Sequence, residues 1–152
     1  MMDADFSHHP DHLPAMLREA ERYDVVIGSR YTSGGRVEGW NLWRTVLSMG
    51  GNLYCRAITR MPVLDCTSGF NVIRVDLLRK IDFSELGLSA YAFQIGLKYH
   101  LWKLGASFKE VPIVFKDRSE GDSKMTGHII WEGILAPWKI VFQYQAPQPG
   151  PK

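Results

Sequence analysis

Two acidic residues, Asp3 and Asp5, stand one residue apart at the start of the chain, in the segment MMDADFSHHP. Carboxylate oxygens suit hard divalent cations, and Mg²⁺ or Mn²⁺ is usually held by one or two carboxylates together with substrate phosphates. One acid could hold such a cation while the other bonds to a sugar hydroxyl. Asp-x-Asp pairs are also common in turns, because short carboxylates accept hydrogen bonds from nearby backbone amides. The spacing alone leaves a metal site and a turn both open.

A second group of polar residues could bind a phosphate. Arg30 follows an apolar run and begins a glycine-rich segment, whereas Arg44 and Ser48 stand four residues apart in a predicted helix and so share one face. The guanidinium fork of arginine matches two oxygens of a phosphate group. Two guanidinium groups and a hydroxyl could therefore converge on one phosphate. The alternative is that Arg44 is an ordinary solvent-exposed helix residue.

A third group lies in the segment DRSEGDSK. Arg118, Ser123 and Lys124 flank Gly121 there, and such a loop can clasp a phosphate when it closes. The segment matches neither a P-loop nor a dinucleotide-binding fingerprint. A polar connection without a ligand has the same composition, so a phosphate-binding loop and a plain connection both stay open.

Alternating helices and strands must position these groups. Apolar periodicity predicts helices over residues 10–23, 41–60, 75–81, 89–105 and about 128–144. Strands are predicted over residues 24–28, 68–74 and 107–115. This alternation is typical of an α/β fold with helices on both faces of the sheet. In such sheets, ligands bind where strands give way to loops.

Glycine and proline mark the connections. Gly34, Gly35 and Gly39 predict a long mobile loop over residues 29–40, because glycine interrupts regular elements. Pro112 predicts an edge or a bulge in the last strand, since proline has no N–H to donate to a neighbouring strand.

Composition limits the classes of function. With 152 residues, 45% of them hydrophobic, the chain is large enough for one domain, expected over residues 1–144, with a disordered tail over residues 145–152. The net charge of +2 and the scattered basic residues indicate no nucleic-acid partner. Cys55 and Cys66 form neither a disulfide framework nor a zinc pattern and are expected to pack as small apolar groups. The absence of a signal peptide and of a long apolar run predicts a soluble protein or one that lies on a membrane surface.

The last predicted helix could serve such a surface. Trp131, Ile134, Leu135 and Trp138 share one of its faces, with Lys139 beside them. Aromatic residues and lysine favour the headgroup zone of a bilayer, so the helix could be an interfacial anchor. Ordinary packing of this face in the core remains equally open.

Six segments, taken in order, carry a resemblance to a known family. They are MDADFSHHP, DVVIGSRY, WRTVLSMGGN, DCTSGFNVIR, YAFQIGLKYHLWKLG and EVPIVFKDRSEGDSKM. Together they resemble the polyprenol-phosphate glycosyltransferases of glycosyltransferase family 2, and among these the mannose synthases. The resemblance runs from Asp3 to about Trp138, and the order of six segments is more specific than any single motif.

The resemblance implies both a fold and a reaction. The fold would be the C-terminal portion of a GT-A (Rossmann-like) domain, with a mixed sheet between two layers of helices. The reaction would transfer mannose from GDP-mannose to a polyprenyl (dolichyl) phosphate, with inversion and with Mg²⁺ or Mn²⁺. The protein would be peripheral, at the cytoplasmic face of a membrane.

On the donor side, the resemblance assigns four residues. Asp3 and Asp5 match the family's Asp-Ala-Asp motif, which contacts the nucleotide sugar and the divalent cation. Arg118 and Lys124 match the loop that binds the donor diphosphate. Asp5 and Arg118 would also be catalytic.

On the acceptor side, Arg30, Arg44 and Ser48 match positions that hold the acceptor phosphate, and Arg44 would also be catalytic. A phosphate monoester has a second pKa of roughly 6, so at neutral pH it is already an anionic nucleophile and needs no general base. Positive groups are needed instead, because two anions must be brought together.

Three departures from the family pattern are visible. Serine stands at Ser7, where the family usually has a longer polar residue, and glycine stands at Gly96, where an acid is usual. The family's first strands, which grip the guanine nucleotide, have no counterpart here, so the isolated chain is expected to be inactive. Two other functions stay open: transfer of glucose from UDP-glucose to a polyprenyl phosphate, and a non-catalytic module that binds lipid phosphate.

Overall fold

The computed structural model describes residues 1–3, 7–83, 86, 90–117 and 127–144. The predicted tail at residues 145–152 lies outside them. The elements in chain order are η1 (Pro10–His12), α1 (Leu13–Glu19), β1 (Val25–Ser29), β2 (Arg36–Glu38), α2 (Leu42–Thr59), β3 (Asn71–Ile73), α3 (Val75–Leu78), α4 (Ala90–Lys103), β4 (Phe108–Pro112), β5 (Val114–Lys116) and α5 (Gly127–Gln143).

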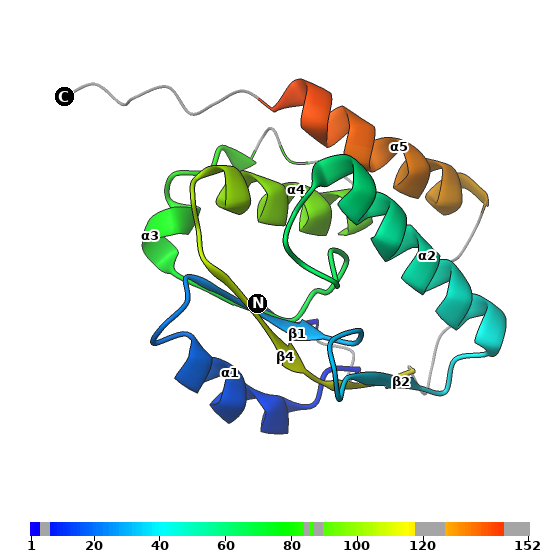
Figure 1. The fold of residues 1–152 in the computed structure, drawn as a ribbon, viewed down its shortest axis with the longest axis horizontal. Coiled ribbons are helices and arrows are strands. Elements are labelled where there is room, and N and C mark those ends of the chain that lie inside the picture. The colour runs from blue at the N-terminus through cyan, green and yellow to red at the C-terminus, as the bar shows by residue number, and fades with distance from the viewer. Residues whose placement is uncertain (4–6, 84–85, 87–89, 118–126, 145–152) are drawn as a thin grey trace.

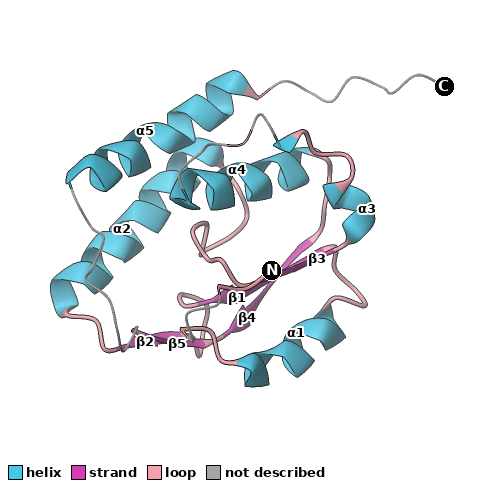
Figure 2. Cartoon of the chain, turned by 180° about the vertical axis from the view of Figure 1, so that it is seen from behind, coloured by secondary structure: helices cyan, strands magenta, loops and turns pink. Residues whose placement is uncertain are grey.

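Strand β1 is the centre of a three-stranded sheet in the order β3-β1-β4 (Figures 1 and 2). It pairs antiparallel with β3, where Val25 lies opposite Ile73. With β4 it pairs in parallel, from Val25 opposite Phe108 to Ser29 opposite Pro112. The sheet is therefore mixed, as the resemblance implies.

Helices cover both faces of this sheet, as the alternation of elements predicts. Helix α1 lies on one side, and α2, α4 and α5 lie on the other (Figure 1). Along β1, Val25 and Ile27 belong to the core cluster under α4 and α5, whereas Val26 packs with Met16 of α1. Adjacent side chains of a strand point to opposite faces, so one buried strand supports two cores.

A second, two-stranded sheet forms where the sequence predicted only a loop. Strand β2 pairs in parallel with β5, from Arg36 opposite Val114 to Glu38 opposite Lys116 (Figure 2). The prediction of a continuous loop over residues 29–40 is therefore wrong at β2. Its partner strand is distant in sequence, so no local pattern of apolar residues reveals it.

The single strand predicted over residues 107–115 is in fact two strands, β4 and β5, that belong to different sheets. Ile113 stands between them: its N–H donates to the Ser29 carbonyl at 3.1 Å, and its own carbonyl accepts from the Arg36 N–H at 3.0 Å. The edge or bulge predicted at Pro112 is confirmed, because β4 is an outer strand of its sheet and the chain changes sheets directly after the proline.

Helix α2 agrees with its predicted bounds to within one residue at each end. It begins after Asn41, whose side chain accepts a hydrogen bond from the Arg44 N–H at 2.8 Å. Such a cap satisfies a donor that has no partner within the helix. The helix ends at Arg60, which is left-handed with φ 58°, just before the pair Met61-Pro62.

Three other elements are shorter than predicted, among them the helix over residues 75–81, which ends at Leu78. The helix over residues 10–23 is a 3₁₀ turn followed by the seven residues of α1. The strand over residues 68–74 is reduced to β3, because the Ser68 hydroxyl donates to the Gly28 carbonyl at 2.7 Å and accepts from the Phe70 N–H at 3.2 Å. At Ser68 a side-chain bond thus takes the place of a backbone bond, whereas the Gly28 N–H still donates to the Phe70 carbonyl at 2.8 Å. Cys55 and Cys66 are free thiols buried in the core, as predicted.

Candidate functional site

Arg30 begins the loop after β1, and a buried acid holds its side chain. Its Nε and Nη2 atoms donate to the two carboxylate oxygens of Asp65 at 2.8 and 2.7 Å, and Nη2 also donates to Thr67 Oγ1 at 2.8 Å. The Asp65 side chain is fully buried, and that of Arg30 is 9% exposed. Burial acts to raise the pKa of the Asp65 carboxyl, but the charge and hydrogen bonds of Arg30 outweigh it and hold the pKa below its usual value. Arg30 is therefore a fixed cation.

The segment that carries Asp65 is itself fixed by a half-buried glutamate and a fully buried lysine. Glu110 of β4 accepts hydrogen bonds from the backbone N–H groups of Leu64 and Asp65, at 2.8 and 2.9 Å. Lys98 of α4 donates to the Ser68 carbonyl at 2.7 Å. Burial lowers the pKa of Lys98 to about 8, against the attraction of Asp65. Glu110 from the sheet and Lys98 from a helix thus hold the backbone of the segment that carries Asp65.

Arg44 lies in the first turn of α2, against the indole ring of Trp40. Its guanidinium carbon is 4.2 Å from the ring centre, within the range of cation–π attraction. Its Nη1 atom donates to both carboxylate oxygens of Asp117, at 3.2 and 3.0 Å. The Arg44 and Asp117 side chains are 28% and 32% exposed, so this ion pair lies at the surface.

Ser48 lies one turn after Arg44, and its Oγ accepts a hydrogen bond from the Tyr31 hydroxyl at 2.6 Å. The Arg30 guanidinium carbon is 5.2 Å from the Tyr31 ring centre and 5.7 Å from that of Trp40. The structure thus brings Arg30, Arg44 and Ser48 into one region, linked by two aromatic rings. The name arginine cluster is used below for Arg30, Tyr31, Trp40, Arg44, Ser48, Asp65 and Asp117.

Asp3 lies against the same segment that contacts Arg30. A Cβ added at Gly69 would meet the Asp3 Oδ2 atom at 2.9 Å, so the carboxylate lies against this glycine. Thr67, two residues earlier, bonds to Arg30. Asp5, Arg118, Ser123 and Lys124 lie outside the described residues.

The described residues contain a partial donor set for a divalent cation. The Asp3 side chain is 52% exposed, and its Oδ2 lies 3.9 Å from His8 Nδ1. An accessible carboxylate oxygen fits Mg²⁺ or Mn²⁺. Within the residues that the structure describes, no group of three His, Cys, Asp or Glu side chains is placed to hold a metal ion. Asp3 alone fits the predicted role in this part of the chain.

The two residues that depart from the family pattern occupy tight places. Ser7 is buried, and its carbonyl accepts a hydrogen bond from the Lys116 N–H at 3.2 Å. At Gly96, an added Cβ would lie 3.3 Å from a methyl group of Leu86, closer than ordinary contact. The glycine therefore lets α4 approach Leu86 in the core.

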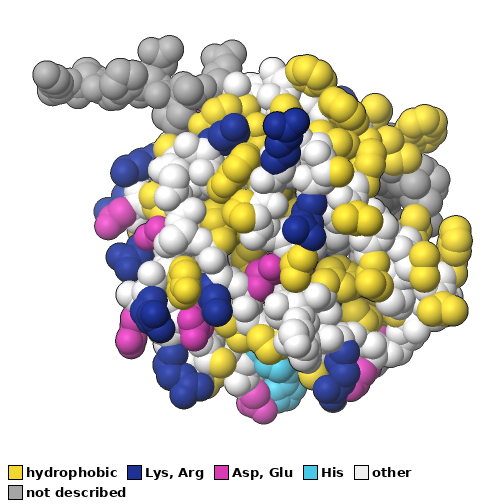
Figure 3. Space-filling view, in the orientation of Figure 1, with side chains coloured by type: hydrophobic (Ala, Val, Ile, Leu, Met, Phe, Trp, Pro, Cys, Tyr) yellow, Lys and Arg dark blue, Asp and Glu magenta, His cyan; other side chains and the backbone are white. Residues whose placement is uncertain are grey.

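A broad apolar surface extends over α2 and α5. Figure 3 shows hydrophobic side chains gathered above these two helices. The exposed ones on α2 are Leu42, Trp43, Val46, Met49 and Leu53, and those on α5 are Trp131, Ile134, Leu135, Trp138 and Phe142. The helices are joined through Tyr54, which donates to the Ile134 carbonyl and accepts from Trp138 Nε1, both at 2.9 Å. The predicted α5 face is therefore exposed rather than packed in the core.

In the part of the chain that the structure describes, no helix combines the length and the apolar character needed to cross a bilayer.

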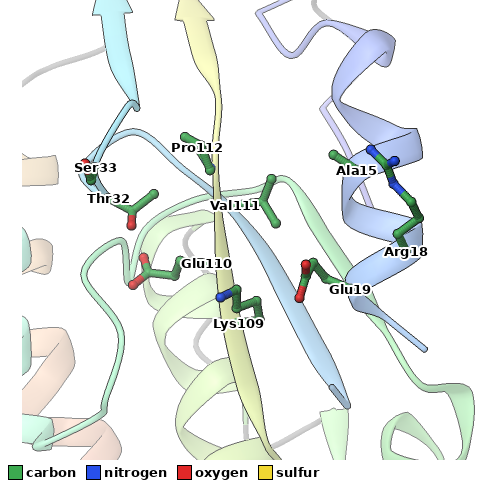
Figure 4. A pocket seen from close by; sticks show the side chains of 9 residues that line it. All are labelled: Ala15, Arg18, Glu19, Thr32, Ser33, Lys109, Glu110, Val111 and Pro112. Atoms are coloured by element: carbon green, nitrogen blue, oxygen red, sulfur yellow. The ribbon is translucent and has the colours of Figure 1, made fainter. Parts of the chain in front are cut away.

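A surface depression of about 530 Å³ lies on the other side of the molecule, between α1 and β4 (Figure 4). Its charged lining is mixed, with Arg18 and Lys109 beside Glu19 and Glu110. The carboxylate of Glu110 is already bonded to two backbone N–H groups. Because its opposite charges are balanced, this depression has no marked preference for an anion.

Sequence reasoning did not single out several residues that shape the arginine cluster. Asp65 and Asp117 each stand in one of the six family-like segments, and Trp40 ends the glycine-rich stretch. An acidic residue in such a segment suggests an ion pair with an arginine, but the sequence does not show which arginine is the partner. Lys98 had no signal beyond its place in an otherwise apolar helix.

The sequence of this chain is similar to those of known glycosyltransferases. Residues 1–82 match the family described as "Glycosyl transferase family 2". The chain is 39% identical over 134 residues to an undecaprenyl-phosphate mannosyltransferase of Micrococcus luteus, covering 88% of this chain and 55% of that protein. It is 41% identical over 142 residues to a polyprenol monophosphomannose synthase of Mycolicibacterium smegmatis, covering 91% of this chain and 54% of that protein. The chain thus spans about half the length of these curated relatives.

Proposed function

Since this chain belongs to glycosyl transferase family 2, we propose that it forms the acceptor-binding part of an enzyme that transfers mannose from GDP-mannose to a polyprenyl phosphate. The names of the two relatives, a mannosyltransferase acting on undecaprenyl phosphate and a polyprenol monophosphomannose synthase, support this choice of sugar and lipid. The product would be polyprenyl phosphate mannose, formed with inversion.

One observation carries the proposal: the arginine cluster lies at helix α2, which also carries part of the large apolar surface. Arg44 and Ser48 lie on α2 in the arginine cluster, and the exposed residues from Leu42 to Leu53 lie on the same helix. A polyprenyl phosphate has the matching form, a doubly charged head on a long hydrocarbon chain. The arginines would hold the head, and the apolar surface would receive the chain.

The chemistry follows from the charges. At neutral pH the acceptor phosphate is already a nucleophile, so the cluster needs no general base. Arg30, fixed by Asp65, and Arg44 would reduce the repulsion between acceptor and donor phosphates. A divalent cation held by Asp3 and Asp5 would neutralise charge on the departing GDP. Arg118 and Lys124 are proposed to bind the donor diphosphate.

We also propose that the apolar faces of α2 and α5 rest on the cytoplasmic surface of a membrane. Trp43 and Trp131 are 72% and 65% exposed, and Lys139 is also exposed on α5. Aromatic rings and lysine are favoured at the headgroup level. This placement would bring the arginine cluster to the depth of the lipid phosphates.

A second candidate is a non-catalytic module that binds lipid phosphate. The arginine cluster and the apolar surface of α2 and α5 favour it as well, because together they could bind a lipid phosphate without any transfer of sugar.

A chimera would test the catalytic proposal. The chain is placed behind the N-terminal part of the Mycolicibacterium smegmatis relative, and the folded chimera is assayed with polyprenyl phosphate and GDP-mannose. Formation of a mannolipid supports the proposal. No transfer by a folded chimera that binds GDP-mannose would favour the non-catalytic module.

A further inference from the structure

Asp117 is placed beside Arg44 by the pairing of β2 with β5. Its backbone N–H donates to the Glu38 carbonyl at 2.9 Å, directly after the last paired residues of the two strands. Gly39 has a φ of +90°, and a Cβ there would meet the Asp117 Cβ at 2.9 Å. Only glycine combines this backbone conformation with so close an approach. The backbone and Cβ of Asp117 are therefore fixed by the fold, and from there the side chain can reach Arg44 or turn away from it.

The contact between Asp117 and Arg44 resembles the contact that a phosphate would make. Both carboxylate oxygens lie within 3.2 Å of Arg44 Nη1, so the carboxylate occupies one side of the guanidinium group, where an oxygen of a phosphate would also bind. Trp40 lies under the same guanidinium, and its Nε1 is buried without a hydrogen-bond partner in the described part of the chain. A donor thus remains unused beside the ion pair.

We propose that Asp117 occupies the phosphate position on Arg44, so that the acceptor phosphate binds by exchange with this carboxylate. The inference rests on the proposed function, since it takes Arg44 as a ligand of the acceptor. An incoming group must outcompete a negative charge that is already in place. A phosphate monoester, with nearly two charges at neutral pH, is the stronger competitor. A phosphodiester lipid carries one charge and has no such advantage, so Asp117 selects monoesters from a membrane rich in diesters.

The test is a calorimetric titration of the chain with geranylgeranyl phosphate in neutral detergent micelles, and separately with phosphatidylglycerol as the diester. For Asp117→Asn we expect monoester binding roughly two- to fivefold tighter, the range of an ion pair that is partly exposed to solvent. We also expect the ratio of the diester Kd to the monoester Kd to fall. Glu38→Gln is the matched control, because Glu38 is the strand neighbour and pairs with Arg36 on the surface at 2.9 Å. It should leave both affinities unchanged.

The outcomes separate this inference from the proposed function. If Arg44→Gln abolishes monoester binding while Asp117→Asn binds no more tightly than the original chain, exchange is wrong and the acceptor site stands. If Arg44→Gln binds normally, or no variant binds, the acceptor site itself is wrong and the inference fails with it. Thermal unfolding shows whether each variant is folded. If Asp117→Asn does not fold, Asp117→Ala replaces it, and the same binding outcomes apply.

Discussion

The guanidinium of Arg30 and the carboxylate of Asp65 form a buried, two-pronged ion pair, with hydrogen bonds of 2.8 and 2.7 Å. The Asp65 oxygen that binds Arg30 Nε also accepts from the Arg30 backbone N–H at 3.0 Å. The acid therefore fixes both the side chain and the start of the loop after β1. This pair is the buried part of the arginine cluster, whereas the side chains of Arg44 and Asp117 are 28% and 32% exposed.

Asp65→Asn should therefore lower the free energy of unfolding of the chain. The change leaves the Arg30 charge buried without its partner, and breaking such a pair costs roughly 3–5 kcal/mol of stability. Urea unfolding followed by circular dichroism measures the loss. Asp76→Asn is the control, since Asp76 pairs with Arg79 at an exposed site, and it should leave the midpoint unchanged. Equal midpoints for both variants would show that the buried pair contributes little.

Stability should depend on pH through Lys98. Its pKa is about 8 in the folded chain against a usual 10.5, so between these values the unfolded chain binds more protons. Stability must then rise with pH across this window, by up to about 1.4 kcal/mol per pH unit from this group. Below the window, both states are protonated and the burial penalty is fully present. In Lys98→Met, the increase in unfolding free energy with pH, measured by urea unfolding, should be absent. An increase as large as that of the unmodified chain would show that other groups cause it.

Arg44→Lys should impair use of the acceptor although the charge is kept. A compact ammonium cannot reproduce the planar fork of arginine, and loss of one charge-assisted hydrogen bond lowers affinity roughly tenfold or more. In the chimera, we expect a higher KM for polyprenyl phosphate and nearly unchanged GDP-mannose affinity. Ser48→Ala should have a smaller effect of the same kind, about 1 kcal/mol. A normal acceptor response of the lysine variant would remove Arg44 from the site.

Binding to vesicles should depend on the apolar faces of α2 and α5. Trp43→Ser and Trp138→Ser each remove an exposed ring from this surface, and both should reduce co-sedimentation with liposomes that contain anionic lipid. Leu17→Ser is the control, because Leu17 is similarly exposed but lies on α1, across the sheet (Figure 1). If all three variants sediment alike, the apolar surface does not contact the membrane.

Local patterns were sufficient to predict the longest elements. Helix α2 has its cap at Asn41, and proline at Pro62 prevents its continuation. The buried strand β1 reads as an apolar run between polar residues. These signals lie within a few residues of the element they define, so sequence reasoning finds them.

Non-local pairing explains what was missed. Strand β2 is only three residues long and exists because β5 lies beside it. Asp65 is 35 positions from Arg30, and Asp117 is 73 positions from Arg44. The sequence predicted that Arg30, Arg44 and Ser48 could meet, but it did not predict that each arginine would already hold a carboxylate. The fold brings these partners together, and no spacing along the chain encodes them.

The acceptor site is tested most directly by ³¹P NMR of geranylgeranyl phosphate in micelles, titrated with the chain at neutral pH. The account predicts that the original chain shifts and broadens the phosphate signal, and that folded Arg44→Gln leaves it unchanged. A folded original chain that does not affect the signal would contradict the account, as would an Arg44→Gln variant that shifts it as the original does.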